Sequence, residues 1–173
     1  SKAAVQIWVR QKALSKDLAG PERPPVVELE KPYLIKNPSD LTFNKDKPPD
    51  AFEEIANSMY DCWDSFERGN MDFLNSMKKE KFCFPCRIIK FSDNVKSEYP
   101  QVPGLNRYLN EYRPLPGENT PTYMQFLTND NSFYLEEDEL TEDIISTDKD
   151  LYILFFAASG RTVGNMFLTF FGV

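Results

Sequence analysis

The strongest constraint on the fold is an amphipathic segment at residues 51–68. Six apolar side chains recur there at the spacing of one helix face: Phe52, Ile55, Ala56, Met59, Trp63 and Phe66. Asp50 stands where an N-cap residue is expected, Glu53 would complete a capping box, and Gly69 supplies a stop signal. Because so broad an apolar face has to be buried against another layer, we expect this segment to be the core helix of a folded domain.

The remainder of the chain predicts strands and short helices in no regular alternation. We expect a strand at 84–91 that enters from a Cys-x-x-Cys turn, a helix at 105–112, a helical turn or strand at 121–128, and strands at 151–158 and 163–171. Polar residues interrupt the apolar C-terminal stretch, which favours two strands and a turn over a membrane helix. The pattern predicts an α+β fold in which a small, mostly antiparallel sheet packs against the core helix.

Two segments precede that domain, which we assign to residues 50–173. Residues 1–19 predict an amphipathic helical arm, with one apolar arc formed by Ala4, Ile7, Trp8, Leu14 and Leu18. This arm is interpreted as a helix packed on its own domain, as a stalk leading from a membrane anchor, or as a segment without fixed structure. Residues 20–49 are a proline-rich strap, expected to be extended, in which residues 33–35 could pair as an edge strand.

Composition excludes several classes of function. The chain of 173 residues is 41% hydrophobic and 14% aromatic, which indicates a folded protein. It contains no histidine, and this excludes Ser-His-Asp and Cys-His nucleophiles as well as histidine-containing metal sites. Its net charge of −7 argues against nucleic acid as a partner.

Cys62, Cys83 and Cys86 are the candidate residues for distinctive chemistry. The plainest hypothesis is a structural disulfide between Cys62 and either Cys83 or Cys86, which would contribute about 3 kcal/mol to stability. A second is a redox pair, Cys83 and Cys86, although the strand pattern after them offers no helix dipole to activate a thiol. The third is zinc, which would need an acidic fourth ligand because the chain has no histidine and no fourth cysteine; we expect no metal and no cofactor. The fourth hypothesis is three reduced thiols buried as small apolar groups.

Residues 136–150 contain eight acidic side chains and are expected to form a solvated loop. The nearby residues 129–131 loosely evoke calcium ligands, but the spacing and glycine of a calcium-binding loop are missing. The sequence singles out no pair of catalytic carboxylates.

Three segments around the cysteines, Met59–Trp63, Phe66–Asn70 and Phe82–Cys86, share a pattern within a region covering about residues 50–157. This pattern resembles that of a family of uncharacterised archaeal membrane-anchored proteins. Glu67 stands where the family pattern usually has glycine. The resemblance implies an N-terminal membrane anchor beyond this chain and a domain that faces outside the cytoplasm. It implies no known reaction.

These observations predict a non-enzymatic, extracytoplasmic interaction or structural domain that acts through a protein partner or through self-association. Contact with the membrane would come from a segment absent from this chain. The first alternative is a thiol-disulfide oxidoreductase that uses Cys83 and Cys86. The second is a structural protein of a virus or mobile element.

Overall fold

The computed structural model describes residues 33–42, 47–66, 81–117, 119–136 and 144–158, with the backbone alone for residues 81–84 and 156–158. The predicted arm at residues 1–19, Gly69 and the predicted strand at 163–171 lie outside these residues. The elements are, in chain order, β1 (Tyr33–Ile35), η1 (Pro38–Leu41), α2 (Asp50–Ser65), β2 (Lys81–Phe91), α4 (Asp93–Glu98), β3 (Gln101–Pro103), α5 (Leu105–Glu111), α6 (Tyr123–Thr128), β4 (Ile144–Ser146) and β5 (Leu151–Ala158). The predicted α+β class is confirmed.

The main sheet has the strand order β1-β2-β5. Strands β2 and β5 form a long antiparallel pair, from Lys81 opposite Ala158 to Ile89 opposite Leu151. Strand β1 runs parallel to β2, because α2 lies between them in the chain and provides the crossover that a parallel pair requires. The short strands β3 and β4 make a separate antiparallel pair. The expectation of a mostly antiparallel sheet is therefore confirmed.

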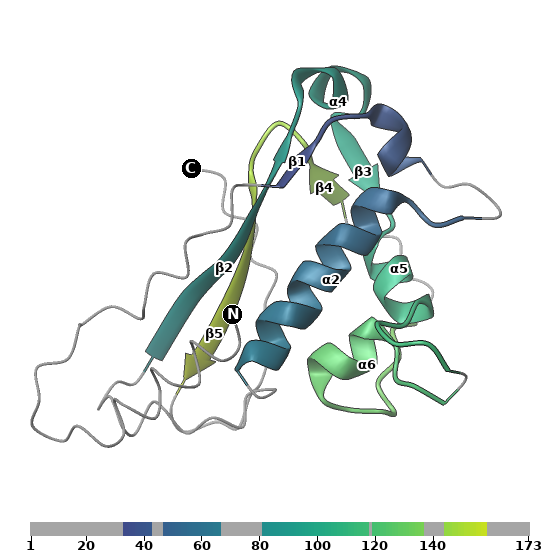
Figure 1. The fold of residues 1–173 in the computed structure, drawn as a ribbon, viewed down its shortest axis with the longest axis vertical. Coiled ribbons are helices and arrows are strands. Elements are labelled where there is room, and N and C mark those ends of the chain that lie inside the picture. The colour runs from purple at the N-terminus through teal and green to yellow at the C-terminus, as the bar shows by residue number, and fades with distance from the viewer. Residues whose placement is uncertain (1–32, 43–46, 67–80, 118, 137–143, 159–173) are drawn as a thin grey trace, which may run out of the picture.

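Helix α2 is the centre of the fold, as its apolar face predicts. Figure 1 shows it lying between the β2–β5 pair on one side and helices α5 and α6 on the other. The side chains of Phe52, Ile55 and Trp63 are completely buried. Beyond the last turn, the ring of Phe66 stacks on that of Phe155 in β5 with centroids 3.9 Å apart. All six positions of the predicted apolar face are buried. The helix stabilises the domain because this apolar surface is removed from water between the two layers.

The start of α2 differs from the prediction. Asp50 is the first helical residue rather than the N-cap, and Pro49 occupies the cap position without a side-chain hydrogen bond. The extended backbone of Pro49 ends the preceding segment one residue earlier than expected. The Asp50 carboxylate lies 2.6 Å from the Lys47 ammonium and still places negative charge at the positive end of the helix dipole.

The proline-rich strap contributes to the core. Its predicted edge strand is present as β1, and Ile35 at the end of that strand is buried. The prediction of an extended chain fails at η1, a short 3₁₀ helix that buries Leu41. Pro38 stands in the first turn of η1, where its fixed φ suits a helix start and its missing N–H leaves no bond unmade.

The layer formed by α5 and α6 is fixed by its caps. Gly104, at the N-cap of α5, has φ of 102°, a left-handed conformation that a side chain would strain. The segment 121–128, which the sequence leaves open between helix and strand, becomes helix α6. Its start is a capping box in which the Thr122 hydroxyl accepts from the Gln125 N–H and the Gln125 side chain accepts from the Thr122 N–H.

Candidate functional site

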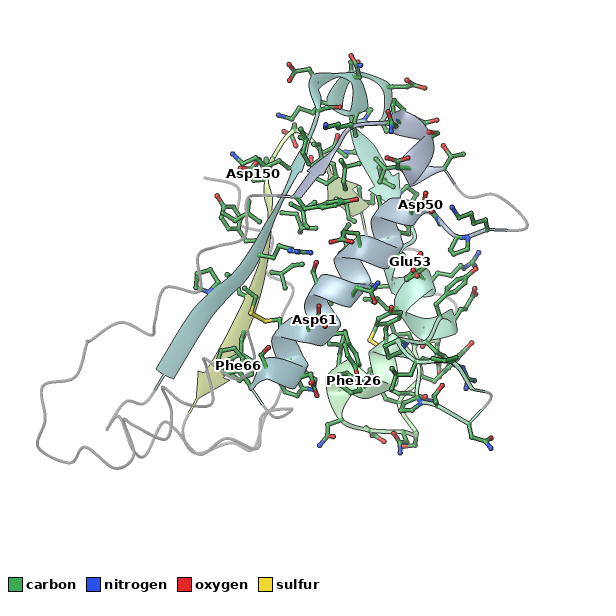
Figure 2. The ribbon with its side chains drawn as sticks, viewed as in Figure 1. Asp50, Glu53, Asp61, Phe66, Phe126 and Asp150 are labelled. Carbon is green, nitrogen blue, oxygen red and sulfur yellow. A yellow bond between two sulfur atoms is a disulfide. The ribbon has the colours of Figure 1, made fainter. Side chains whose placement is uncertain are left out.

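The candidate site is the contact between α2 and β2, which we call the α2–β2 junction: Glu54, Ser58 and Cys62 from the helix, Cys86 and Arg87 from the strand. Cys62 and Cys86 form a disulfide with Cα atoms 5.7 Å apart, a separation typical of such bonds. Figure 2 shows this bond between the helix and the sheet. Of the two disulfides that the sequence leaves open for Cys62, the structure contains the one with Cys86.

A β-bulge explains how two consecutive residues of β2 reach the same helix. Pro85 pairs with Leu154 and Arg87 with Ile153, so the register shifts between them and Cys86 is the extra residue of a bulge on β2. Regular alternation would send neighbouring side chains to opposite faces of the sheet, whereas a bulge re-aims one of them. Pro85 suits this place because it has no N–H to give to the ladder. Cys86 can therefore bond Cys62 while Arg87 contacts the preceding turns of α2.

The polar groups of the junction satisfy one another. The Arg87 guanidinium forms an ion pair with the Glu54 carboxylate and donates to the Ser58 hydroxyl at 2.8 Å. Ser58 is buried, and its hydroxyl donates to the Glu54 backbone carbonyl at 2.8 Å. The Ser58 hydroxyl therefore donates its proton to a backbone carbonyl of its own helix. The group that donates to the Ser58 oxygen is the Arg87 cation, which cannot act as a base. This arrangement stabilises the contact and does not activate a nucleophile.

Cys83 lies elsewhere in β2, in register opposite Phe156. The sequence predicts that the Cys-x-x-Cys segment is a turn leading into a strand, but β2 begins at Lys81 and contains the whole motif. Three residues of extended chain span about 10 Å, beyond the roughly 7 Å that a disulfide tolerates between Cα atoms. The predicted redox pair of Cys83 and Cys86 is therefore not brought together, and Cys86 is bonded to Cys62 instead.

Tyrosines form a second polar cluster, on the α5–α6 side of α2. The Tyr123 hydroxyl donates to Asn57 Oδ1 at 2.5 Å, and the Tyr108 ring stacks on that of Tyr112. Burial, with a smaller contribution from the charge of Glu53, raises the pKa of Tyr123 to about 12 and also raises the pKa of Tyr108. Both phenols stay protonated near neutral pH, and the Tyr123 hydroxyl acts as a hydrogen-bond donor. Sequence reasoning missed this cluster because its members come from three separate helices.

A stacked pair closes the same side of the helix. The ring of Tyr60 lies on that of Phe126, with centroids 4.2 Å apart. In Figure 2, Phe126 lies on the α6 side of α2 and Phe66 lies toward the sheet. Aromatic contacts therefore pack both α6 and the sheet against α2.

The acidic segments show local structure where they are described. The Asp130 carboxylate accepts from the Ser132 N–H at 2.9 Å and from the Ser132 hydroxyl at 2.6 Å, and these bonds lower the pKa of Asp130. The expectation of a loop over 136–150 is wrong at Ile144–Ser146, which forms β4 and buries Ile145. Within the described parts of the chain, no three acidic or cysteine side chains gather closely enough to hold a metal ion.

The described residues also include no helix long and apolar enough to cross a membrane. In comparisons with known proteins, no family model, curated protein or solved structure matches the chain.

Proposed function

We propose that this chain is a non-catalytic interaction or structural domain on the extracytoplasmic side of a membrane, stapled by the Cys62–Cys86 disulfide. The observation that carries the proposal is the disulfide itself. It joins the central helix to the middle strand of the main sheet, and Cys62 is 4% exposed. A bond so placed suits a structural staple better than a reactive exchange centre. Disulfides of this kind persist in oxidising compartments and are rare in a reducing cytosol.

The chemistry of the interior supports a role without catalysis. The junction commits Arg87, Glu54 and Ser58 to one another, and the two buried tyrosines keep their protons at neutral pH. With no histidine in the chain, the usual general base for neutral pH is missing from the whole sequence. Such a protein acts through the surface that its fold presents to a partner or to a second copy.

The membrane location rests on the sequence. The resemblance to membrane-anchored archaeal proteins supports an anchor outside residues 1–173, and so does the amphipathic arm at residues 1–19 where it is interpreted as a stalk. Attachment to the outer side of a membrane would provide the oxidising surroundings that a structural disulfide needs.

The test is a search for a partner with the oxidised chain as bait. The wild-type chain, purified without reductant, is used for native mass spectrometry and for capture from the membrane fraction of the source cells. We expect self-association or one captured protein, with weaker capture by Cys62→Ser and unchanged capture by the matched control Cys83→Ser. A monomer that captures nothing in either assay would contradict an interaction role.

A further inference from the structure

The main sheet has two faces, and only one of them packs against α2. The alternation of β2 and β5 turns Ile89, Leu151 and Ile153 toward the helix, where all three are buried. Their neighbours lie on the opposite side of the sheet and are only half-buried: Ile88, Tyr152 and Leu154. A sheet with an apolar second face generally packs that face against another layer.

Strand β1 extends this face. Leu34 is paired with Lys90 on the side away from α2, and the Leu34 side chain is 44% exposed. At the same end of the sheet, Lys90 Nζ lies 3.5 Å from an Asp150 carboxylate oxygen and gives the face a charged rim. We call Leu34, Ile88, Tyr152 and Leu154 the outer sheet face. Its apolar centre and polar edge are typical of a contact surface.

We propose that the outer sheet face is the docking site of this chain's own N-terminal segment, residues 3–18. The apolar arc of that segment brings together a tryptophan, three aliphatic side chains and an alanine: Ala4, Ile7, Trp8, Leu14 and Leu18. An amphipathic helix laid on the sheet would add a third layer, with its apolar arc inward and its charges toward water.

The linker between the N-terminal segment and the sheet is short. It joins the sheet at the edge strand β1, which forms part of the outer sheet face. The 14 residues from 19 to 32 join the segment to Tyr33, the first residue of β1. Such a linker spans roughly 45 Å when extended, whereas the 11 residues of β2 extend over about 36 Å. Every point of the face is within reach. A tether of this length keeps the segment at a local concentration of about 1 mM, so even weak contacts would hold it.

Charge favours the same arrangement. Residues 1–18 contain four basic side chains, Lys2, Arg10, Lys12 and Lys16, against one acid, Asp17, which gives a net charge of +3. Since the whole chain carries −7, the remaining 155 residues carry −10. A basic segment is attracted to its own acidic domain, and this attraction steers it before the apolar contact forms.

The test follows Trp8 in the full chain by acrylamide quenching of fluorescence. Subtraction of a Trp8→Phe variant removes the signal of Trp63, which is completely buried. We expect Trp8 to be quenched at least threefold less than a free tryptophan analogue. Leu154→Asp should raise the quenching of Trp8 at least twofold, whereas Ile144→Asp, a substitution at an exposed residue of β4, should leave it unchanged.

Substitutions in residues 3–18 leave the residues of the sheet unchanged. They therefore test docking independently of any effect on folding of the sheet. Ile7→Asp should expose Trp8 as Leu154→Asp does, whereas Val9→Asp, outside the apolar arc, should not. The proposal is overturned if Trp8 is quenched like the free analogue, or if neither aspartate substitution changes its quenching. Shielding that disappears on dilution, together with a dimer in sedimentation, would assign the face to a second copy and would also overturn it.

Discussion

Loss of the Cys62–Cys86 disulfide should destabilise the domain by an amount that follows from its loop length. The two cysteines are 24 residues apart in sequence. The chain-entropy relation, evaluated for a loop of this size at 25 °C, gives a stabilisation of about 3.5 kcal/mol, which acts through the unfolded state. For a chain of this size that corresponds to a fall in melting temperature of about 7–14 °C.

The assay is denaturant unfolding of the wild-type chain with and without a phosphine reductant, followed by far-UV circular dichroism. Cys62→Ala and Cys86→Ala should each reproduce the reduced protein. In Cys83→Ser, reduction should still lower the free energy of unfolding by about 3.5 kcal/mol, since Cys83 takes no part in the bond. If reduction left the unfolding midpoint of the wild type unchanged, or if reduction had no effect on Cys83→Ser, the reasoning would be refuted.

Three further outcomes test the packing. Arg87→Met should cost about 1–2 kcal/mol, because it leaves a half-buried Glu54 carboxylate without its cation, and the double variant with Glu54→Gln should recover part of that loss in equilibrium unfolding. Phe155→Ala should cost about 3–5 kcal/mol in the same assay, since the ring is buried between α2 and the sheet; a smaller loss would mean that the site collapses around the cavity. The raised pKa values of Tyr123 and Tyr108 mean that the unfolded chain loses these protons first, so stability should fall as pH rises from 10 toward 12, and Tyr123→Phe should reduce the fall. An absorbance titration at 295 nm that finds no tyrosine with a raised pKa would contradict this prediction.

Helix α2 was the most predictable element, because its apolar spacing reports directly on burial. The six predicted core positions need no knowledge of the remaining chain, since any partner layer would select the same face. The long strands β2 and β5 are predictable for a similar reason, being rich in β-branched and aromatic residues.

The geometry of the site was harder to predict because it depends on one extra residue in β2. Pro85 and the Cys-x-x-Cys spacing are typical of a turn, and only pairing with β5 shows that they belong to a bulge within a strand. Which cysteine bonds Cys62 is decided by that bulge. The local sequence does not determine the register between β2 and β5, which are 60 residues apart in the chain.

Short elements were missed for a different reason. Helix α4 has six residues, but its Ser92 N-cap, whose hydroxyl accepts from the Val95 N–H, was a readable signal. Strands β3 and β4 have three residues each and little pattern to detect. A hydrogen bond between residues that flank these strands connects them: the Thr147 hydroxyl donates to the Tyr99 carbonyl at 2.7 Å.

The central claim is a structural disulfide in an oxidising compartment, and thiol counting tests it most directly. The chain is purified from its natural location without reductant, alkylated, and weighed intact before and after reduction, with the linked peptides then mapped. We predict one alkylated cysteine, Cys83, before reduction, three after it, and a single linked peptide pair that contains Cys62 and Cys86. Three alkylated cysteines before reduction, or a bond between Cys83 and Cys86, would contradict the account.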